Sequence, residues 1–183
     1  MSEQQTFISE KDLTLEDQVL PIPPEIRENR TIFTSVEREL LPGLLCYDLT
    51  GLGADKLFVD PRIAVPCAAL VTPNNHFHIF QSAGELNPIP DLLEAIHKAA
   101  GASRALLVGE STNIKYGVPE NPIGSQLIEP LRKLGLEIPP ENIDLGGRYA
   151  RRVVSTKNEA YVLKRSIDDE TPPSCKQFSW FQE

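Results

Sequence analysis

Two short apolar segments joined by a turn, within residues 66–80 (PCAALVTPNNHFHIF), constrain the fold of this chain more than any other feature. Residues 67–71 and 76–80 each have the composition of a short strand. Residues 72–75 suit a type I turn, because proline fixes φ at its second position and asparagine is tolerated after it. The sequence therefore predicts an antiparallel hairpin with a four-residue loop.

The length of this loop decides which residues lie opposite each other. The predicted pairs are Val71–His76, Ala69–His78 and Cys67–Phe80. Because side chains alternate between the two faces of a sheet, Cys67, His76 and His78 share one face. His78 is then the diagonal neighbour of Cys67, roughly 7 to 8 Å away between backbones, whereas His76 lies one pleat further. A two-residue loop at Asn74–Asn75 would instead move His78 away.

A cysteine beside a histidine predicts either a nucleophile with its base or two ordinary buried side chains. A free thiol has a pKa of about 8.5, and a neighbouring imidazole raises the thiolate fraction and can protonate a leaving amine. Cysteine is also among the most buried residue types, and strand histidines are commonly half-buried. The residues alone leave both interpretations open for Cys67 and His78.

The rest of the chain alternates strand and helix signals. A helix is predicted over residues 90–101, with Asp91 as N-cap and Gly101 at its end. A second is predicted over residues 123–134, and it must accommodate Pro130 by a kink or by starting late. This alternation predicts an α+β (mixed α/β) fold in which helices pack on a mixed sheet. The remaining predicted strands are 44–47, 57–59, 104–108, 151–155 and 160–163.

The length of the chain, 183 residues with 40% hydrophobic composition, suits one globular domain with its own core. Residues 1–35 are polar, acidic and interrupted by the sequence PIPP, so we expect an extended acidic N-terminal arm. We expect a single domain over residues 36–166 and a C-terminal tail over residues 167–183. The aromatic residues of that tail are expected to dock on the protein's own core.

Charge and hydropathy disfavour two classes of partner. The net charge is -8 and the pI about 5.0, so the basic surface that a nucleic acid requires is missing. No apolar run approaches the roughly 20 residues that cross a bilayer, and residues 1–10 do not resemble a signal peptide. We therefore expect a cytoplasmic protein without membrane insertion. One sequence does not predict its oligomeric state.

Cysteine and glycine patterns predict neither a metal site nor a cofactor site. The three cysteines, at positions 46, 67 and 175, are far apart and form no CxxC pair. Cys46 is expected in the core, and His97 on the surface of a helix. Residues 51–53 (GLG) lack the third glycine of a dinucleotide motif, and residues 109–112 (GEST) lack the P-loop lysine.

Four segments downstream of the hairpin resemble, in order, the second half of the bacterial chemoreceptor glutamine deamidase family, CheD. In that family a strand ends in a glycine, an Ile-Gly segment starts a helix, and an Asp-Leu-Gly-Gly turn leads into the last strands. The resemblance is clearest over residues 104–155 and implies a central β-sandwich-like mixed sheet flanked by helices. The segments are LLVGES (106–111), PIGSQ (122–126), KLGLEI (133–138) and DLGGRYAR (144–151).

The resemblance also implies a site and an activity. The family's cysteine begins a hairpin and its histidine lies on the returning strand, where this chain has Cys67 and His78. It implies that these two residues are catalytic, and that Gly146, Gly147 and Arg151 bind the substrate. The implied activity is deamidation of glutamine side chains in a protein substrate, without a cofactor. Family members also bind a signalling phosphatase, so a protein partner is expected.

The chain departs from the family pattern just before Cys67. The family's cysteine follows a Gly-x-Gly-Ser segment where this chain has residues 64–66 (AVP), and an expected upstream threonine is Pro61. Proline offers no N–H to a developing oxyanion. Three functions therefore stay open: a protein-glutamine deamidase, a catalytically inactive CheD-like protein-binding module, or an unrelated function on a shared architecture.

Overall fold

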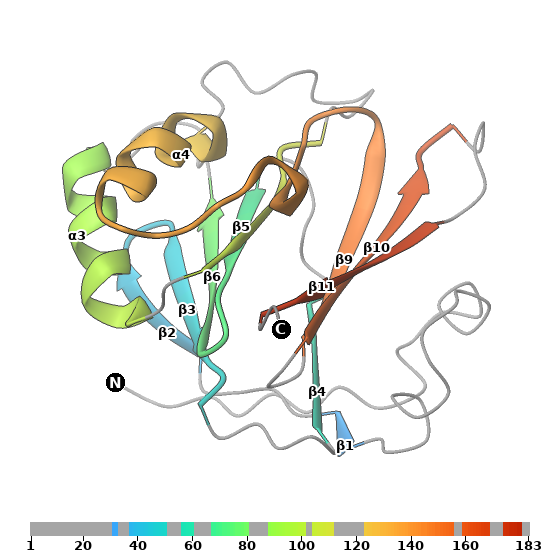
Figure 1. Cartoon of the computed structure of the whole chain (residues 1–183), viewed down its shortest axis with the longest axis horizontal. Helices are drawn as coiled ribbons and strands as arrows, with labels where there is room; N and C mark the ends of the chain where they lie inside the picture. Colours follow the sequence, from blue (N-terminus) through green and yellow to red (C-terminus); the bar gives the residue numbers. More distant parts are fainter. Residues whose placement is uncertain are drawn as a thin grey trace.

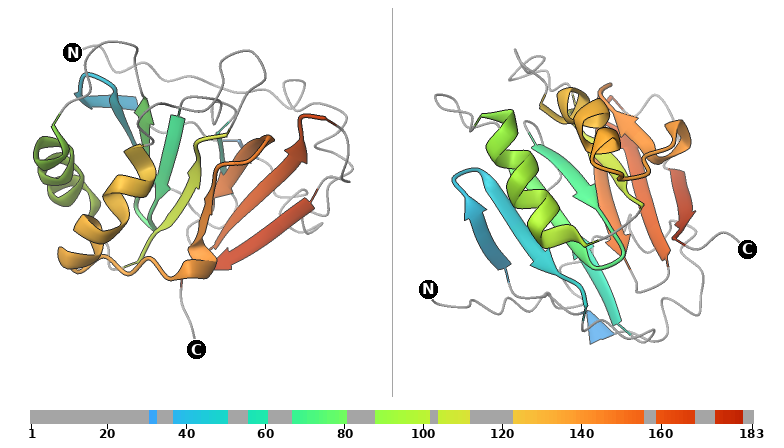
Figure 2. Two further views of the ribbon diagram at one scale, coloured as in Figure 1. Left: turned by 90° about the horizontal axis from the view of Figure 1, so that it is seen from above. Right: turned by 60° about the vertical axis from the view of Figure 1, so that its left-hand side comes forward.

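The structure is a computed structural model that describes residues 31–32, 37–50, 56–60, 67–80, 88–101, 104–111, 123–155, 159–168 and 174–180. These residues form two β-sheets and two α-helices, arranged in three layers (Figures 1 and 2). One sheet lies between the helices and the other sheet. The predicted α+β fold, with a β-sandwich flanked by helices, is therefore confirmed.

The central layer is a six-stranded mixed sheet with the order β2-β3-β6-β5-β7-β8. Neighbouring strands are antiparallel except β7 and β8, which are parallel. The hairpin predicted from the sequence supplies its two middle strands. The strands are β2 (Glu37–Leu41), β3 (Leu44–Asp48), β5 (Cys67–Val71), β6 (Asn75–Phe80), β7 (Leu106–Gly109) and β8 (Ile143–Leu145).

The second sheet has the order β1-β4-β9-β10-β11 and is antiparallel except between β1 and β4. Its last strand lies in the segment predicted as a tail, and the side chains of Phe178 and Trp180 are each only 5% exposed. The expectation that these aromatic residues dock on the protein's own core is confirmed. The strands are β1 (Thr31–Ile32), β4 (Lys56–Asp60), β9 (Tyr149–Ser155), β10 (Glu159–Ser166) and β11 (Ser174–Ser179).

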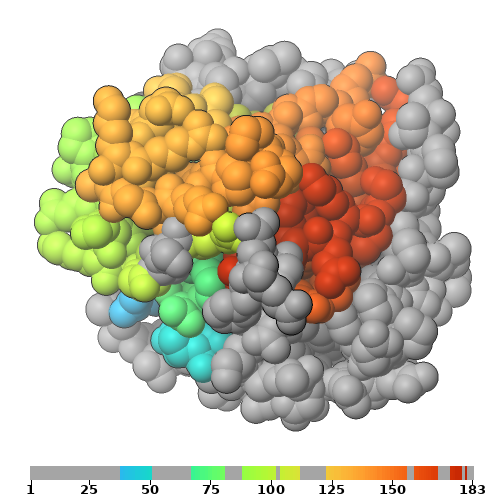
Figure 3. All heavy atoms as spheres, in the orientation of Figure 1, coloured from blue at the N-terminus to red at the C-terminus, as the bar shows by residue number. Residues whose placement is uncertain are grey.

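The space between the sheets is closed by aliphatic side chains and by two aromatic ones. Alternate residues of β5 and β7 point toward the second sheet, and alternate residues of β9 and β10 point back, as the two-residue repeat of a strand requires. In Figure 3 the surface of β9 to β11 lies directly beside that of α4 and the residues after it. This core contains Ala69, Val71, Leu106, Val108, Val153, Ala160, Val162, Phe178 and Trp180.

The opposite face of the six-stranded sheet is covered by α3 (Ile89–Ala100) and α4 (Ile123–Lys133) (Figure 1). A short 3₁₀ turn, Pro140–Asn142, leads into β8. Leu92 and Ile96 of α3 are buried against the strands, together with Leu127 and Leu131 of α4. None of the described helices is long and apolar enough to cross a membrane.

The helix ends differ in one respect from the prediction. Helix α3 begins at Ile89 with Pro88 as N-cap, so the prediction of Asp91 as N-cap is wrong. Proline fits the first turn, where its missing N–H costs nothing, and Asp91 lies inside that turn. Gly101 ends the helix in the left-handed conformation, as predicted. Helix α4 begins at Ile123 and contains Pro130, which excludes a late start.

Candidate active site

The β5–β6 hairpin has the predicted register. Cys67 lies opposite Phe80, Ala69 opposite His78 and Val71 opposite His76. The loop is held by Thr72, whose hydroxyl donates to the Asn75 carbonyl and accepts from the Asn75 N–H, each at 3.0 Å. Because the register follows from this loop, the hairpin brings Cys67 and the two histidines to the face that the second sheet covers.

Cys67 and His78 are in hydrogen-bonding contact. The Sγ atom of Cys67 lies 3.5 Å from Nδ1 of His78, within hydrogen-bonding distance for sulfur, and the thiol also has the Ala68 carbonyl as an acceptor at 3.6 Å. Cys67 is 2% exposed and His78 is 0% exposed. The pair predicted from the hairpin is therefore formed, and it is closed to solvent.

Aromatic rings surround His78 on the same face. Its ring centroid lies 5.7 Å from that of Tyr47, 5.5 Å from that of Phe80 and 5.0 Å from that of His76. Tyr47 also meets the ring of His76 edge-on, at 6.0 Å. Packed rings restrict the rotation of the imidazole, so Nδ1 stays directed at the thiol.

Glu110, which is not among the site residues predicted from the sequence, lies directly beside Cys67. Its N–H donates to the Cys67 carbonyl at 2.9 Å, which extends the β5–β7 pairing by one residue. Its φ of 52° is positive, and it is the one non-glycine residue with positive φ in the described part of the chain. A positive φ strains a side-chain-bearing residue, and such strain gathers at functional sites.

The carboxylate of Glu110 caps the start of α4. It accepts hydrogen bonds from the N–H groups of Gly124 and Ser125. Burial raises the pKa of Glu110 above its ordinary value, and these two hydrogen bonds only partly offset that effect. The side chain therefore holds the first turn of α4 against the end of β7, next to Cys67.

The raised pKa of Glu110 gives a prediction for stability against pH. The folded state favours the protonated carboxyl, so this contribution to stability is complete below the ordinary pKa of 4.5 and is lost as the pH rises through the folded pKa. A glutamine stays uncharged and still accepts both N–H groups. We therefore expect Glu110→Gln to gain stability relative to the wild type as the pH increases from 4 to 8, in urea unfolding.

Glu94 provides the control for this experiment. It is exposed on α3, and its hydrogen bond and ion pair with Lys98 lower its pKa. A Glu94→Gln variant should show a small change of the opposite sign with pH. If Glu110→Gln instead lost stability with rising pH, the carboxylate would be stabilised in the folded state, contrary to this interpretation.

Gly146 and Gly147 form the turn between β8 and β9, with φ angles of 79° and 71°. The N–H of Gly146 donates to the Gly109 carbonyl at 2.9 Å. A Cβ on Gly147 would come within 2.8 Å of the Tyr149 ring. The turn therefore requires glycine for conformational reasons and is attached to the residue before Glu110.

Arg151 is committed to contacts inside the protein. Its guanidinium donates to the Ser111 hydroxyl at 2.6 Å, to the Gly146 carbonyl at 2.6 Å and to the Asp144 carboxylate at 3.0 Å. Its side chain is only 1% exposed. These contacts hold the glycine turn to the segment after β7, which is a structural role for the residue predicted to bind substrate.

Asp144 joins Arg151 to Lys164 of β10. Burial alone would raise the pKa of Asp144, but hydrogen bonds and charges from Arg151 and Lys164 hold it below its ordinary value. Lys164 also lies 4.0 Å from the ring centroid of Tyr149. The group is therefore an ion-pair network between the two sheets.

The predicted site has two parts, the Cys67–His78 pair and the glycine turn with Arg151. They are connected through the end of β7. Cys67 begins β5 beside Gly109 and Glu110, while Gly146 and Arg151 contact Gly109 and Ser111 respectively. No contact joins Arg151 to Cys67 or His78 directly among the described residues. In the sequence this junction corresponds to the segment GES at 109–111, which lies within the first segment of the CheD resemblance.

The other candidate side chains lie elsewhere. Cys46 is buried on the helix-covered face, as predicted, and its pKa is raised to about 11, chiefly by burial. His97 is exposed on α3, also as predicted. Cys175 lies half-buried on β11. Within the described ranges, no cluster of three or more histidine, cysteine or acidic residues could hold a metal ion.

The segment that departs from the CheD pattern, including Pro61 and Pro66, lies outside the described residues, as does most of the predicted N-terminal arm. Neither a comparison with protein-family models nor a search of curated proteins finds a match for the chain. The resemblance to CheD therefore stays a prediction, and function has to be argued from the geometry of the site.

Proposed function

We propose that the protein is a cysteine-dependent amidohydrolase that deamidates glutamine side chains of a protein substrate. The observation that carries this proposal is the 3.5 Å distance between Cys67 Sγ and His78 Nδ1. A thiol at this distance from an imidazole can pass its proton to that base and become the nucleophile. A reducing compartment keeps a thiol nucleophile reduced, so the proposal includes a cytoplasmic location.

The proposed reaction begins when His78 takes the proton of Cys67 and the thiolate attacks the carbon of the glutamine carboxamide. The C–N bond then breaks, and His78 returns its proton to the departing ammonia. This leaves a thioester between Cys67 and the substrate. Water, deprotonated by His78, attacks the thioester and breaks the C–S bond. The sulfur recovers the proton, and the products are glutamate and ammonia.

The burial of the pair supports a second candidate function. Cys67 and His78 are at most 2% exposed, so a carboxamide can reach the sulfur only after the surrounding side chains move. A pair that never opens would serve packing alone, and the domain would then be a CheD-like protein-binding module without catalysis. The two candidates differ in whether His78 lowers the pKa of the Cys67 thiol.

The test is the pH dependence of thiol alkylation by iodoacetamide, followed at each cysteine by mass spectrometry. For the enzyme we expect the plot of the Cys67 alkylation rate against pH to bend well below pH 8.5, because a neighbouring imidazole favours the thiolate. The bend marks the apparent pKa of the thiol. In His78→Ala this bend should occur at a higher pH. Cys46 is an internal control: it is equally buried, at 1% exposed, but its pKa is raised to about 11, so its rate should rise only in strong alkali.

His76 supplies the matched variant. It is as buried as His78 but lies one pleat further from Cys67, so His76→Ala should leave the bend near its wild-type pH. An ordinary thiol titration at Cys67, unchanged by His78→Ala, would contradict the enzyme and favour the binding module.

A further inference from the structure

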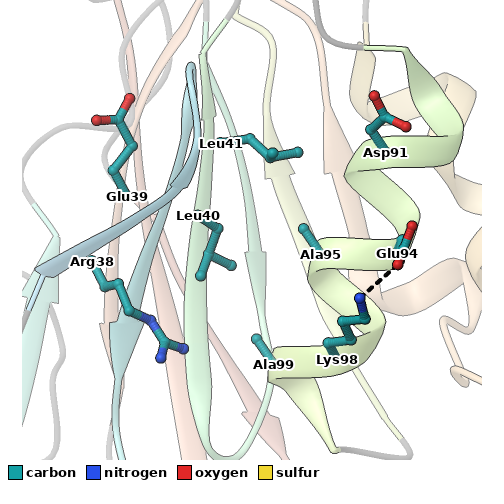
Figure 4. Close-up of a pocket in the computed structure, with 9 residues that line it drawn as sticks. All are labelled: Arg38, Glu39, Leu40, Leu41, Asp91, Glu94, Ala95, Lys98 and Ala99. Carbon is teal, nitrogen blue, oxygen red and sulfur yellow. Dashed lines mark hydrogen bonds and ion pairs between the residues drawn. The ribbon is translucent and has the colours of Figure 1, made fainter.

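A groove lies between β2 and α3, on the helix-covered side of the six-stranded sheet (Figure 4). Its volume is about 630 Å³. Cys67 and His78 face the second sheet instead, so the groove is separate from the candidate active site. Binding in the groove would therefore not depend on catalysis.

The strand that borders the groove is an edge strand in the described part of the chain. β2 pairs with β3 on one side and ends the six-stranded sheet on the other. The outer side of an edge strand presents backbone N–H and C=O groups that can pair with an added strand. An extended peptide therefore has hydrogen-bonding groups to meet along β2.

The interior of the groove is apolar, with small side chains on the helix. Leu40 and Leu41 of β2 point toward α3, and Ala95 and Ala99, one helical turn apart, face them (Figure 4). These four residues are only partly buried. Because alanine leaves room beside the helix, apolar side chains of a bound peptide could fill the space.

The charge at the Asp91 end of the groove favours a basic side chain in the occupant. Three carboxylates and two cationic side chains line it. Glu94 and Lys98 neutralise each other in an ion pair of 2.6 Å, and Arg38 lies at the end of the groove away from Asp91 (Figure 4). Asp91 forms no ion pair with a described residue, whereas the Glu39 carboxylate points away from α3 (Figure 4). A second copy of this chain, with a net charge of -8, would bring like charge to the same surface.

We propose that the groove between β2 and α3 binds an extended peptide of a partner protein. The peptide adds a strand to β2 through backbone hydrogen bonds, which is a recurrent mode of peptide recognition. Its alternate apolar side chains occupy the space beside Ala95 and Ala99, and a lysine or arginine pairs with Asp91.

The experiment selects peptides from a random phage-displayed library on the purified full chain and measures the dissociation constants of the synthesised winners by fluorescence anisotropy. We expect winners with alternating apolar residues and at least one lysine or arginine. Ala95→Arg fills the groove and should weaken their binding at least about tenfold. His97→Arg places the same side chain on an exposed position of α3 outside the groove and should leave binding unchanged.

A charge-reversal variant keeps the test independent of packing changes in α3. Asp91 is exposed, so Asp91→Lys should weaken lysine-containing winners without unfolding the chain. The proposal is overturned if no peptide is selected, or if the winners bind Ala95→Arg as tightly as the wild type. A dimer in sedimentation that Ala95→Arg abolishes would identify a second copy as the occupant and would equally overturn it.

Discussion

Replacing Cys67 by serine is expected to lower the rate of glutamine deamidation on the order of a thousandfold or more. The expectation rests on the proposed function. A serine hydroxyl holds its proton far more tightly than a thiol, so the imidazole of His78 at the same place would generate little nucleophile. The rate would be followed by ammonia release from glutamine-containing peptides, with the mass gain of about one unit that follows from amide-to-acid exchange.

The control for this variant is Cys175→Ser, which removes a thiol on β11 in the second sheet. We expect it to keep the wild-type rate. Urea unfolding of both variants separates a loss of chemistry from a loss of structure. A Cys67→Ser protein that stays folded and retains its deamidase rate would show that the activity belongs to another group.

Replacing Gly109 by alanine is expected to destabilise the fold by about 3 to 5 kcal/mol or more, against a total of about 5 to 15 kcal/mol for a typical domain. The added Cβ would lie 2.3 Å from the Cys67 carbonyl oxygen and 3.0 Å from Cα of Ala68. Both are backbone atoms of a middle strand, so relief would require β5 and β7 to separate. The φ of Gly109, 125°, adds strain for any residue with a side chain.

Gly135 separates these two causes. Its φ is also positive, at 91°, but a Cβ there would meet no heavy atom within 4 Å. Gly135→Ala should therefore cost only about 1 to 2 kcal/mol, the conformational part alone. Urea unfolding midpoints compare the two variants. If both variants lost the same free energy of unfolding, the clash with the Cys67 carbonyl would be relieved at no cost in stability. The close approach of β5 and β7 would then contribute little to the stability of the fold.

The hairpin shows what local sequence can predict. Its register was predictable because the loop between Val71 and His76 has a fixed length, and the two-residue repeat of a strand then assigns every face. That register makes Cys67 and His78 diagonal neighbours, and the rings packed around His78 direct its Nδ1 at the thiol. Strand–helix alternation predicted the layers for a similar reason, since each amphipathic element needs one face buried.

Other parts depended on contacts between distant segments. β2 carries three charged residues in the sequence ERELL and has no apolar alternation that would reveal it. Glu110 came to attention only through its positive φ and its place between Cys67 and α4, both products of tertiary structure. The resemblance implies substrate binding by Arg151, and in the fold its guanidinium contacts Ser111, Asp144 and Gly146, which are distant from it in sequence or lie in the turn before it.

All five residues of β5 are buried, because helices cover one face of this strand and the second sheet covers the other. A substitution beside the thiol that is meant to change the chemistry of this protein therefore has to fit close packing at each position of β5. New specificity would have to be introduced on surfaces that a ligand can reach without disturbing β5. The sequence of the hairpin itself is best left as it is.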